Sequence, residues 1–380
     1  MKPRHRLSLT EWSAALDVAA SAALWESHAP ELLRLSPGDE ARFAQVCARH
    51  HLQVVDAYER QVLDLAAARF PQPNALGARE RFVAERVDSA SVLTAGTWVW
   101  YPWSRTVVHL LDEDEYFEVI TNRNRDKLTL EEMELLRGKT VGVVGLSVGA
   151  EAAVTLAQEH LCGTLRIADF DHLDLSNLNR LQAGCEDLGL PKTTVAARRI
   201  ARIDPYLRVE VFADGVTAGN LDDFMEGLDL LLDECDGLEM KLVLREAARA
   251  RGIDVAYAGD ERGFLSVEPY GRNTHLPLFH GRIGRAQRPR QEYASALDFW
   301  KDLSVWLGGW DGISPRSRQS LLQVGEHLCG YPQLASEIRL AAGEVGHVAR
   351  RLLLGEPLRA QVLQIDLDAL LAMDGESEDN

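Results

Sequence analysis

The chain has 380 residues, a hydrophobic content of 46% and a formal net charge of −17 at pH 7. This length accommodates two or three domains with real cores, and the acidic balance argues against general binding of nucleic acid or of anionic membranes. The chain opens without a charged-then-apolar signal segment and has no apolar run of about 18 residues, so we expect a cytoplasmic protein with reduced thiols.

The five cysteines do not form a C-x-x-C pair anywhere in the chain. Structural zinc sites built from thiolates usually carry such pairs. We therefore expect no structural zinc.

Residues 1–120 are expected to form an N-terminal, mainly helical domain. Ser8 and Glu11 have the spacing of a capping box, and helical periodicity continues to about residue 70. Residues 96–112 are rich in β-branched and aromatic side chains, which predicts one or two strands. Three tryptophans in this segment favour core or interface packing over a stacking surface.

Residues 140–169 resemble a nucleotide-binding unit in their order of elements. A buried strand is followed by a tight turn in which Gly145, Ser147 and Gly149 are small, so backbone amides can approach phosphate oxygens at a helix N-terminus. A second apolar run ends at Asp169, where a Rossmann-like unit places its ribose-binding acid.

The rest of the chain alternates short apolar runs with helical patterns. This alternation predicts a Rossmann-like, mostly parallel sheet with helices on both faces, and nucleotide outside the carboxyl ends of the strands. A C-terminal extension of helices and a last strand follows, so we expect one domain over 121–370 and a disordered acidic tail over 371–380. The expected strands are 140–145, 165–169, 208–212, 228–233 and 253–258, and the expected helices are 149–160, 192–203, 218–226 and 238–251.

Four short motifs occur in order: Asp169-x-Asp171, Ser176-Asn-Leu-Asn-Arg180, Lys192 after Gly-Leu-Pro, and Glu234-Cys-Asp-Gly237. Together they resemble the ThiF/MoeB/HesA superfamily of ubiquitin-activating-enzyme-like adenylyltransferases, over roughly residues 123–270. The chain departs from the family pattern at Ser147, Leu181 and Gly237, and looks more like a bacterial branch that is sometimes fused to a nitroreductase-like domain.

The resemblance implies an ATP- and Mg²⁺-dependent enzyme that activates a carboxylate as an acyl-adenylate. The turn would bring the backbone to the nucleotide, Asp169 would accept from the ribose, and Asp171 would be a turn or ribose-side acid. An arginine ahead of the first strand would reach the ATP of a partner subunit, which implies a homodimer. The remaining implied roles are phosphate contacts for Asn177, Arg180 and Lys192, Mg²⁺ binding for Asp236, and the trans contact for Arg123 or Arg125.

A purely structural role stays open for each of these residues. Asp169 could end a strand, Asn177 could form a turn, Asp236 could cap a helix, and the basic residues could be surface charges. The resemblance leaves the carboxylate open: the C-terminus of a ubiquitin-like or sulfur-carrier protein, a peptide, or a small molecule.

The acceptor and the activity class also stay open. Residues 236–328 contain no cysteine, although thioester-forming relatives carry theirs in this part of the chain. Cys185 is the thiol most worth testing as an acceptor. A nucleotide-binding scaffold or pseudoenzyme, and an NAD-dependent oxidoreductase, are the alternatives.

Overall fold

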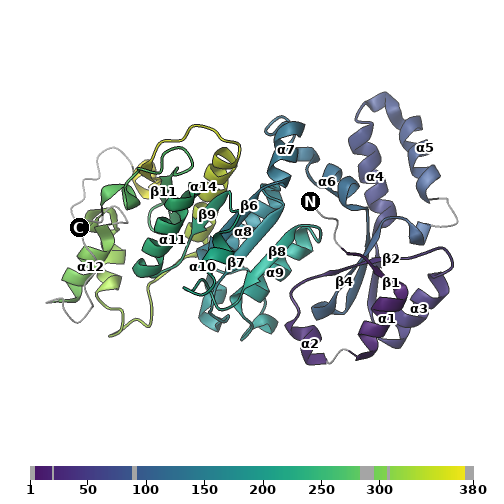
Figure 1. The fold of residues 1–380 in the computed structure, drawn as a ribbon, viewed down its shortest axis with the longest axis horizontal. Helices are drawn as coiled ribbons and strands as arrows, with labels where there is room; N and C mark the ends of the chain where they lie inside the picture. The colour runs from purple at the N-terminus through teal and green to yellow at the C-terminus, as the bar shows by residue number, and fades with distance from the viewer. Residues whose placement is uncertain (1–4, 19–20, 88–91, 283–294, 306–308, 373–380) are drawn as a thin grey trace. The chain divides into compact units, whose positions relative to one another are not determined.

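The computed structural model describes residues 5–18, 21–87, 92–282, 295–305 and 309–372. The chain folds as two compact units, one of residues 1–133 with 197–208, the other of residues 134–196 with 209–380 (Figure 1). None of the helices described is long and apolar enough to cross a membrane. The sequence-based division at residue 120 stays a proposal, because compactness does not test which parts fold independently. The tail at 373–380 lies outside the described residues.

The first unit combines helices with a five-stranded sheet. The predicted capping box is present, since the Glu11 amide donates to Ser8 Oγ at 3.3 Å and the Ser8 amide donates to a Glu11 carboxylate oxygen at 2.8 Å. The prediction of one or two strands within 96–112 is confirmed, since two are present. Three shorter strands were not predicted, because runs of two to four residues show no alternation. The sheet order is β1-β2-β4-β5-β3, with β1 Leu7–Ser8, β2 Glu31–Arg34, β3 Gln53–Asp56, β4 Thr97–Tyr101 and β5 Thr106–Leu110. The helices are α1 Leu9–Val18, α2 Ser21–Glu26, α3 Glu40–Arg49, α4 Tyr58–Arg69, α5 Leu76–Val87 and α6 Glu113–Ile120.

Tryptophans form the centre of the first unit, as the composition of residues 96–112 predicted. Trp98 and Trp100 of β4 are buried, and Trp12 of α1 packs edge-on against Trp100 with ring centroids 5.9 Å apart. The aromatic segment therefore serves core packing.

The second unit contains the predicted mostly parallel sheet. Its order is β12-β11-β10-β9-β6-β7-β8, in which β6, β7, β9 and β10 are parallel and β11 and β12 are antiparallel to their neighbours. The strands are β6 Thr140–Val144, β7 Thr164–Ala168, β8 Arg208–Phe212, β9 Leu230–Asp233, β10 Asp254–Gly259, β11 Phe264–Glu268 and β12 Gln361–Gln364. All five predicted strands of the α/β core are present within two residues of their expected ends.

Helices cover both faces of this sheet (Figure 1). The other described α-helices of the chain are α7 Leu130–Arg137, α8 Val148–Glu159, α9 Lys192–Ile203, α10 Leu221–Met225, α11 Leu238–Arg251, α12 Ala296–Ser304, α13 Pro315–Leu321, α14 Ala335–Leu353 and α15 Leu367–Leu371, of which α7 and α9 have residues in both units. Asp233 contacts α11, whereas its neighbour Glu234 lies against Gly149 of α8. Because consecutive strand residues point to opposite faces, α11 and α8 cover opposite sides of the sheet. Helix α14 packs against α8.

Candidate active site

The glycine turn after β6 lies directly against the backbone that follows β9. Gly145 has φ +88°, and a Cβ there would overlap the Glu234 carbonyl and lie 2.7 Å from the Cys235 amide nitrogen. Both the backbone conformation and the close approach therefore require glycine. Ser147 is the N-cap of α8, and its side chain makes no capping hydrogen bond, so the amides of this helix end are not capped by Ser147.

Asp169 fastens the end of β7 to this turn. Its Oδ2 accepts from the Leu146 amide at 2.6 Å and its Oδ1 accepts from the Asp171 amide at 2.7 Å. The side chain is buried, and burial raises the pKa of Asp169 despite these two hydrogen bonds. Each carboxylate oxygen keeps a second lone pair, so the geometry is compatible with a further donor.

Asp171 and Lys192, which are 21 residues apart, form an ion pair. Lys192 Nζ lies 2.7 Å from Asp171 Oδ2, and the Lys192 amide donates to the Asp171 carbonyl at 2.9 Å. The lysine side chain is 8% exposed and the aspartate side chain 51%. The lysine is therefore held at the sheet edge with its charge directed to one half-exposed carboxylate.

Asn177 and Arg180 lie in the 3-10 helix η5 Leu175–Asn179 and at its C-cap. Asn177 Oδ1 accepts from the Asp174 amide at 3.0 Å, so its side chain has a turn-forming contact. Arg180 Nη1 donates to the Ser176 carbonyl at 3.2 Å, and its buried Nε has no hydrogen-bond partner among the described residues.

Two carboxylates oppose the arginine. Burial lowers the pKa of Arg180, while the charges of Asp260 and Asp236 raise it. Asp236 is exposed in the loop between β9 and α11, and the N-cap of α11 is Gly237, so Asp236 is not the capping residue. Burial raises the pKa of Asp260 to about 6, and Asp260 Oδ2 has no partner in the described part of the chain.

Sequence reasoning missed Asp260, although its position could have indicated it. It directly follows β10, and carboxyl ends of parallel strands are where such sheets bind ligands. In contrast, Arg123 and Arg125 are exposed and belong to the first unit, so their predicted trans role stays a prediction. Residues that follow the carboxyl ends of the parallel strands lie at one edge of the second unit's sheet: Gly145, Ser147, Gly149, Asp169, Asp171, Asp236 and Asp260. Lys192 is paired with Asp171 there, and the charges of Asp236 and Asp260 act on Arg180.

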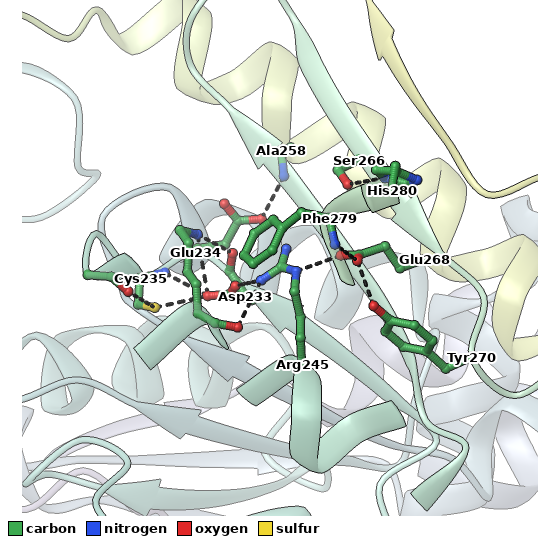
Figure 2. Close-up of polar contacts among 12 residues, drawn as sticks. Asp233, Glu234, Cys235, Arg245, Ala258, Ser266, Glu268, Tyr270, Phe279 and His280 are labelled. Carbon is green, nitrogen blue, oxygen red and sulfur yellow. Dashed lines mark hydrogen bonds and ion pairs between the residues drawn. The ribbon is translucent and has the colours of Figure 1, made fainter. Parts of the chain in front are cut away.

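A buried ion cluster beneath this edge also escaped the sequence analysis. It comprises Asp233, Lys241, Arg245 and Glu268, whose side chains are at most 2% exposed. Figure 2 shows Asp233, Arg245 and Glu268 of this cluster. Arg245 pairs with both Asp233 and Glu268, at 2.5 Å from its Nε to Glu268 Oε2. Burial alone would raise the pKa of Asp233, but Lys241 and Arg245 outweigh burial and hold it below its ordinary value.

Residues 121–270 match the ThiF family. This segment is a ThiF-family domain. The match confirms the resemblance inferred from the four sequence motifs. The matched segment contains every residue named above at the sheet edge.

Three relatives are longer than the part of them that matches this chain. The chain is 42% identical over 277 residues to "Uncharacterized protein MT1398" of Mycobacterium tuberculosis, which covers 73% of this chain and 39% of that protein. It is 28% identical over 184 residues to Ubiquitin-like modifier-activating enzyme 5 of Drosophila persimilis, covering 42% and 47% of the two chains. It is 32% identical over 117 residues to Sulfur carrier protein ThiS adenylyltransferase of Bacillus subtilis, covering 29% and 35%. The chain thus spans less than half the length of each of these relatives.

Proposed function

We propose that the ThiF-family domain binds ATP at the carboxyl ends of β6, β7, β9 and β10 and transfers the adenylyl group to a carboxylate, releasing pyrophosphate. One observation supports this proposal: Asp169 and Asp236 follow the carboxyl ends of β7 and β9, Lys192 pairs with Asp171 beside Asp169, and the charge of Asp236 acts on Arg180. Parallel sheets bind nucleotides at this edge. The names of two relatives, a ThiS adenylyltransferase and a modifier-activating enzyme, support the same reaction.

The residue types suit this chemistry. A carboxylate nucleophile is already an anion, so attack on the α-phosphate requires positioning and charge neutralisation and no general base. Arg180 brings an Nε–H that has no partner among the residues the structure describes, and Lys192 can exchange its half-exposed partner Asp171 for a phosphate oxygen. Asp169, or the more exposed Asp171, would accept from the ribose hydroxyls.

Magnesium fits as an ion shared between the protein and ATP. The described residues contain no group of three histidine, cysteine or acidic side chains that could hold a metal ion. Mg²⁺ is commonly bound by one or two carboxylates together with substrate phosphates and water. Asp236 is exposed and would supply the carboxylate, with Asp260 close enough to affect the same arginine.

The substrate and assembly are part of the proposal. The carboxylate would be the C-terminus of a ubiquitin-like or sulfur-carrier protein, or a peptide or small molecule, and Cys185 is an exposed thiol that could receive the acyl group. A homodimer would allow Arg123 or Arg125 to reach the partner's ATP. Size-exclusion chromatography at micromolar concentration tests this, and a monomer would contradict the trans role.

Pyrophosphate exchange tests the reaction itself. The full chain is incubated with MgATP, labelled pyrophosphate and a panel of carboxylates that includes peptides ending in Gly-Gly. Exchange lost in Asp236→Ala and Arg180→Ala supports the proposed site, and exchange that survives both overturns it. Asp222→Ala is the matched control, because Asp222 is an exposed acid of the same unit outside the sheet edge. Stabilisation by MgATP without exchange for any carboxylate would favour a nucleotide-binding scaffold.

A further inference from the structure

A strained turn lies beside the buried ion cluster. In the 3-10 helix η7 Leu278–Gly281, Phe279 has φ 47° and His280 has φ 57°, and Gly281 follows with φ 76°. Two consecutive non-glycine residues in the left-handed region are uncommon, and a bulky residue there is an outlier. Such a conformation persists only where the surrounding contacts hold it.

Residues of β11 supply these contacts. The Phe279 amide donates to Glu268 Oε1 at 2.7 Å, and His280 Nε2 lies 2.9 Å from Ser266 Oγ. Ser266 and Glu268 are two residues apart on the strand and therefore point to the same face. The Phe279 ring also lies over the Arg245 guanidinium, 4.1 Å from ring centroid to Cζ.

From the turn, a continuous chain of contacts runs to the end of β9 (Figure 2). Glu268 Oε1 accepts from Tyr270 Oη at 2.6 Å, and Glu268 Oε2 accepts from Arg245 Nε at 2.5 Å. Arg245 Nη1 then donates to Asp233 Oδ2. The two acids and two bases of this buried cluster balance in charge, and Arg245 Nη2 is the donor of Arg245 that has no hydrogen-bond partner among the described residues.

This chain of contacts holds both ends of the loop that carries Asp236. At the first end, Asp233 Oδ1 accepts from Cys235 Sγ at 2.9 Å, and Lys241 Nζ donates to the Asp233 carbonyl at 3.1 Å. At the second end, Leu238 packs with Phe279 of the strained turn. Asp236 lies between these two anchors.

We propose that Arg245 and Glu268 are positioning residues for Asp236. Their ion pair fixes Asp233 at one end of the loop and the Phe279 turn at the other, and so holds the Asp236 carboxylate where Mg²⁺ and the ATP phosphates meet. This inference rests on the proposed function, because it assigns Asp236 to the metal–phosphate site.

The test measures the Mg²⁺ concentration that gives half-maximal thermal stabilisation by ATP in the full chain. We expect Asp236→Asn and Glu268→Gln each to raise this concentration about tenfold or more, as substitutions behind a metal ligand do. The double variant should need no more Mg²⁺ than Asp236→Asn alone, because Glu268 acts only through Asp236. Glu210→Gln is the control: Glu210 pairs with Arg166 Nε at 2.6 Å in the same sheet, and its loss should leave the Mg²⁺ requirement unchanged.

The outcomes separate this inference from the function on which it rests. A Glu268→Gln protein that melts earlier without nucleotide but keeps the wild-type Mg²⁺ requirement overturns the positioning role. If Glu268→Gln does not fold, Arg245→Lys keeps the positive charge but replaces the guanidinium, whose separate nitrogens pair with Asp233 and Glu268, by a single ammonium. A raised Mg²⁺ requirement of Arg245→Lys supports the role, and an unchanged requirement contradicts it. Wild-type protein without any Mg²⁺-dependent stabilisation by ATP, or an Asp236→Asn variant that behaves as wild type, overturns the proposed function itself.

Discussion

The sheet edge and the buried ion cluster contain the same residue types in opposite states. At the edge, Asp236 is exposed, Asp171 is half-exposed, and Arg180 keeps an unpartnered Nε–H in the described part of the chain. In the cluster, Asp233 and Glu268 are buried and are paired with Arg245. Charges with spare hydrogen-bonding capacity are available to a ligand, whereas mutually compensated charges fix the backbone. The comparison predicts that substitutions in the cluster act on stability first and those at the edge on catalysis first.

Arg245→Met should have the largest effect on stability. It leaves Asp233 and Glu268 buried without their shared partner, and breaking such a pair costs about 3–5 kcal/mol of unfolding free energy. Urea denaturation followed by fluorescence measures the loss. Arg166→Met is the matched control and should cost less, because its partner Glu210 is partly exposed. Equal losses in the two variants would remove the distinction between the cluster and an ordinary ion pair.

Lys192→Met should lower activity strongly and stability only slightly. We expect pyrophosphate exchange to fall by about 100-fold or more, as when a charge-stabilising donor to the transition state is removed. Stability should fall by only about 1 kcal/mol or less, because Asp171 is half-exposed and stays hydrated without its partner. Asp171→Asn separates the two roles of the pair: it should lower exchange activity less than Lys192→Met does if Lys192 acts on phosphate. Full exchange activity in Lys192→Met would mean that Lys192 has no role in the reaction.

Gly145→Ala tests the close backbone contact between the glycine turn at the sheet edge and Glu234, which follows Asp233 of the ion cluster. A side chain there would combine a left-handed conformation with overlap against the Glu234 carbonyl, at a cost of about 1–3 kcal/mol or more. Gly189→Ala is matched in conformation, with φ +84°, and its Cβ would meet no atom within 4 Å. The difference between the melting temperatures of the two variants measures the close approach alone. No difference would mean that the Glu234 backbone moves away freely.

Glu234→Gln should change the pH dependence of stability. Burial raises the pKa of Glu234 from 4.5 to about 8 in the folded state. The folded protein therefore holds this proton more tightly, and the resulting stabilisation is lost as pH rises from about 4.5 through about 8. The slope for one group is at most about 1.4 kcal/mol per pH unit. Denaturation across this range should show a flatter profile for Glu234→Gln than for wild type, and parallel profiles would contradict the raised pKa.

The sequence predicted the sheet more completely than the site. Alternating apolar runs located every parallel strand of the second unit, because buried strands of this kind are continuous apolar segments. Motif order located Asp169, Arg180, Lys192 and Asp236 at one edge, since carboxyl ends of parallel strands meet there. The pairing of Arg245 with Glu268 could not be predicted, because the two residues are 23 positions apart on a helix and an antiparallel strand and belong to no motif. Short strands such as β2 were missed because helical neighbours dominate their periodicity.

The last strand of the larger sheet has a consequence for handling the protein. In the described part of the chain, β12 pairs on one side with β11 and forms the outer edge of the sheet. Leu363 is 41% exposed, Ile365 38% and Leu367 49%, and residues 361–367 contain neither lysine nor proline. An apolar edge without such residues is a template for intermolecular strand pairing. Self-association at high concentration should therefore begin at this edge, and a lysine in place of Leu363 should delay it.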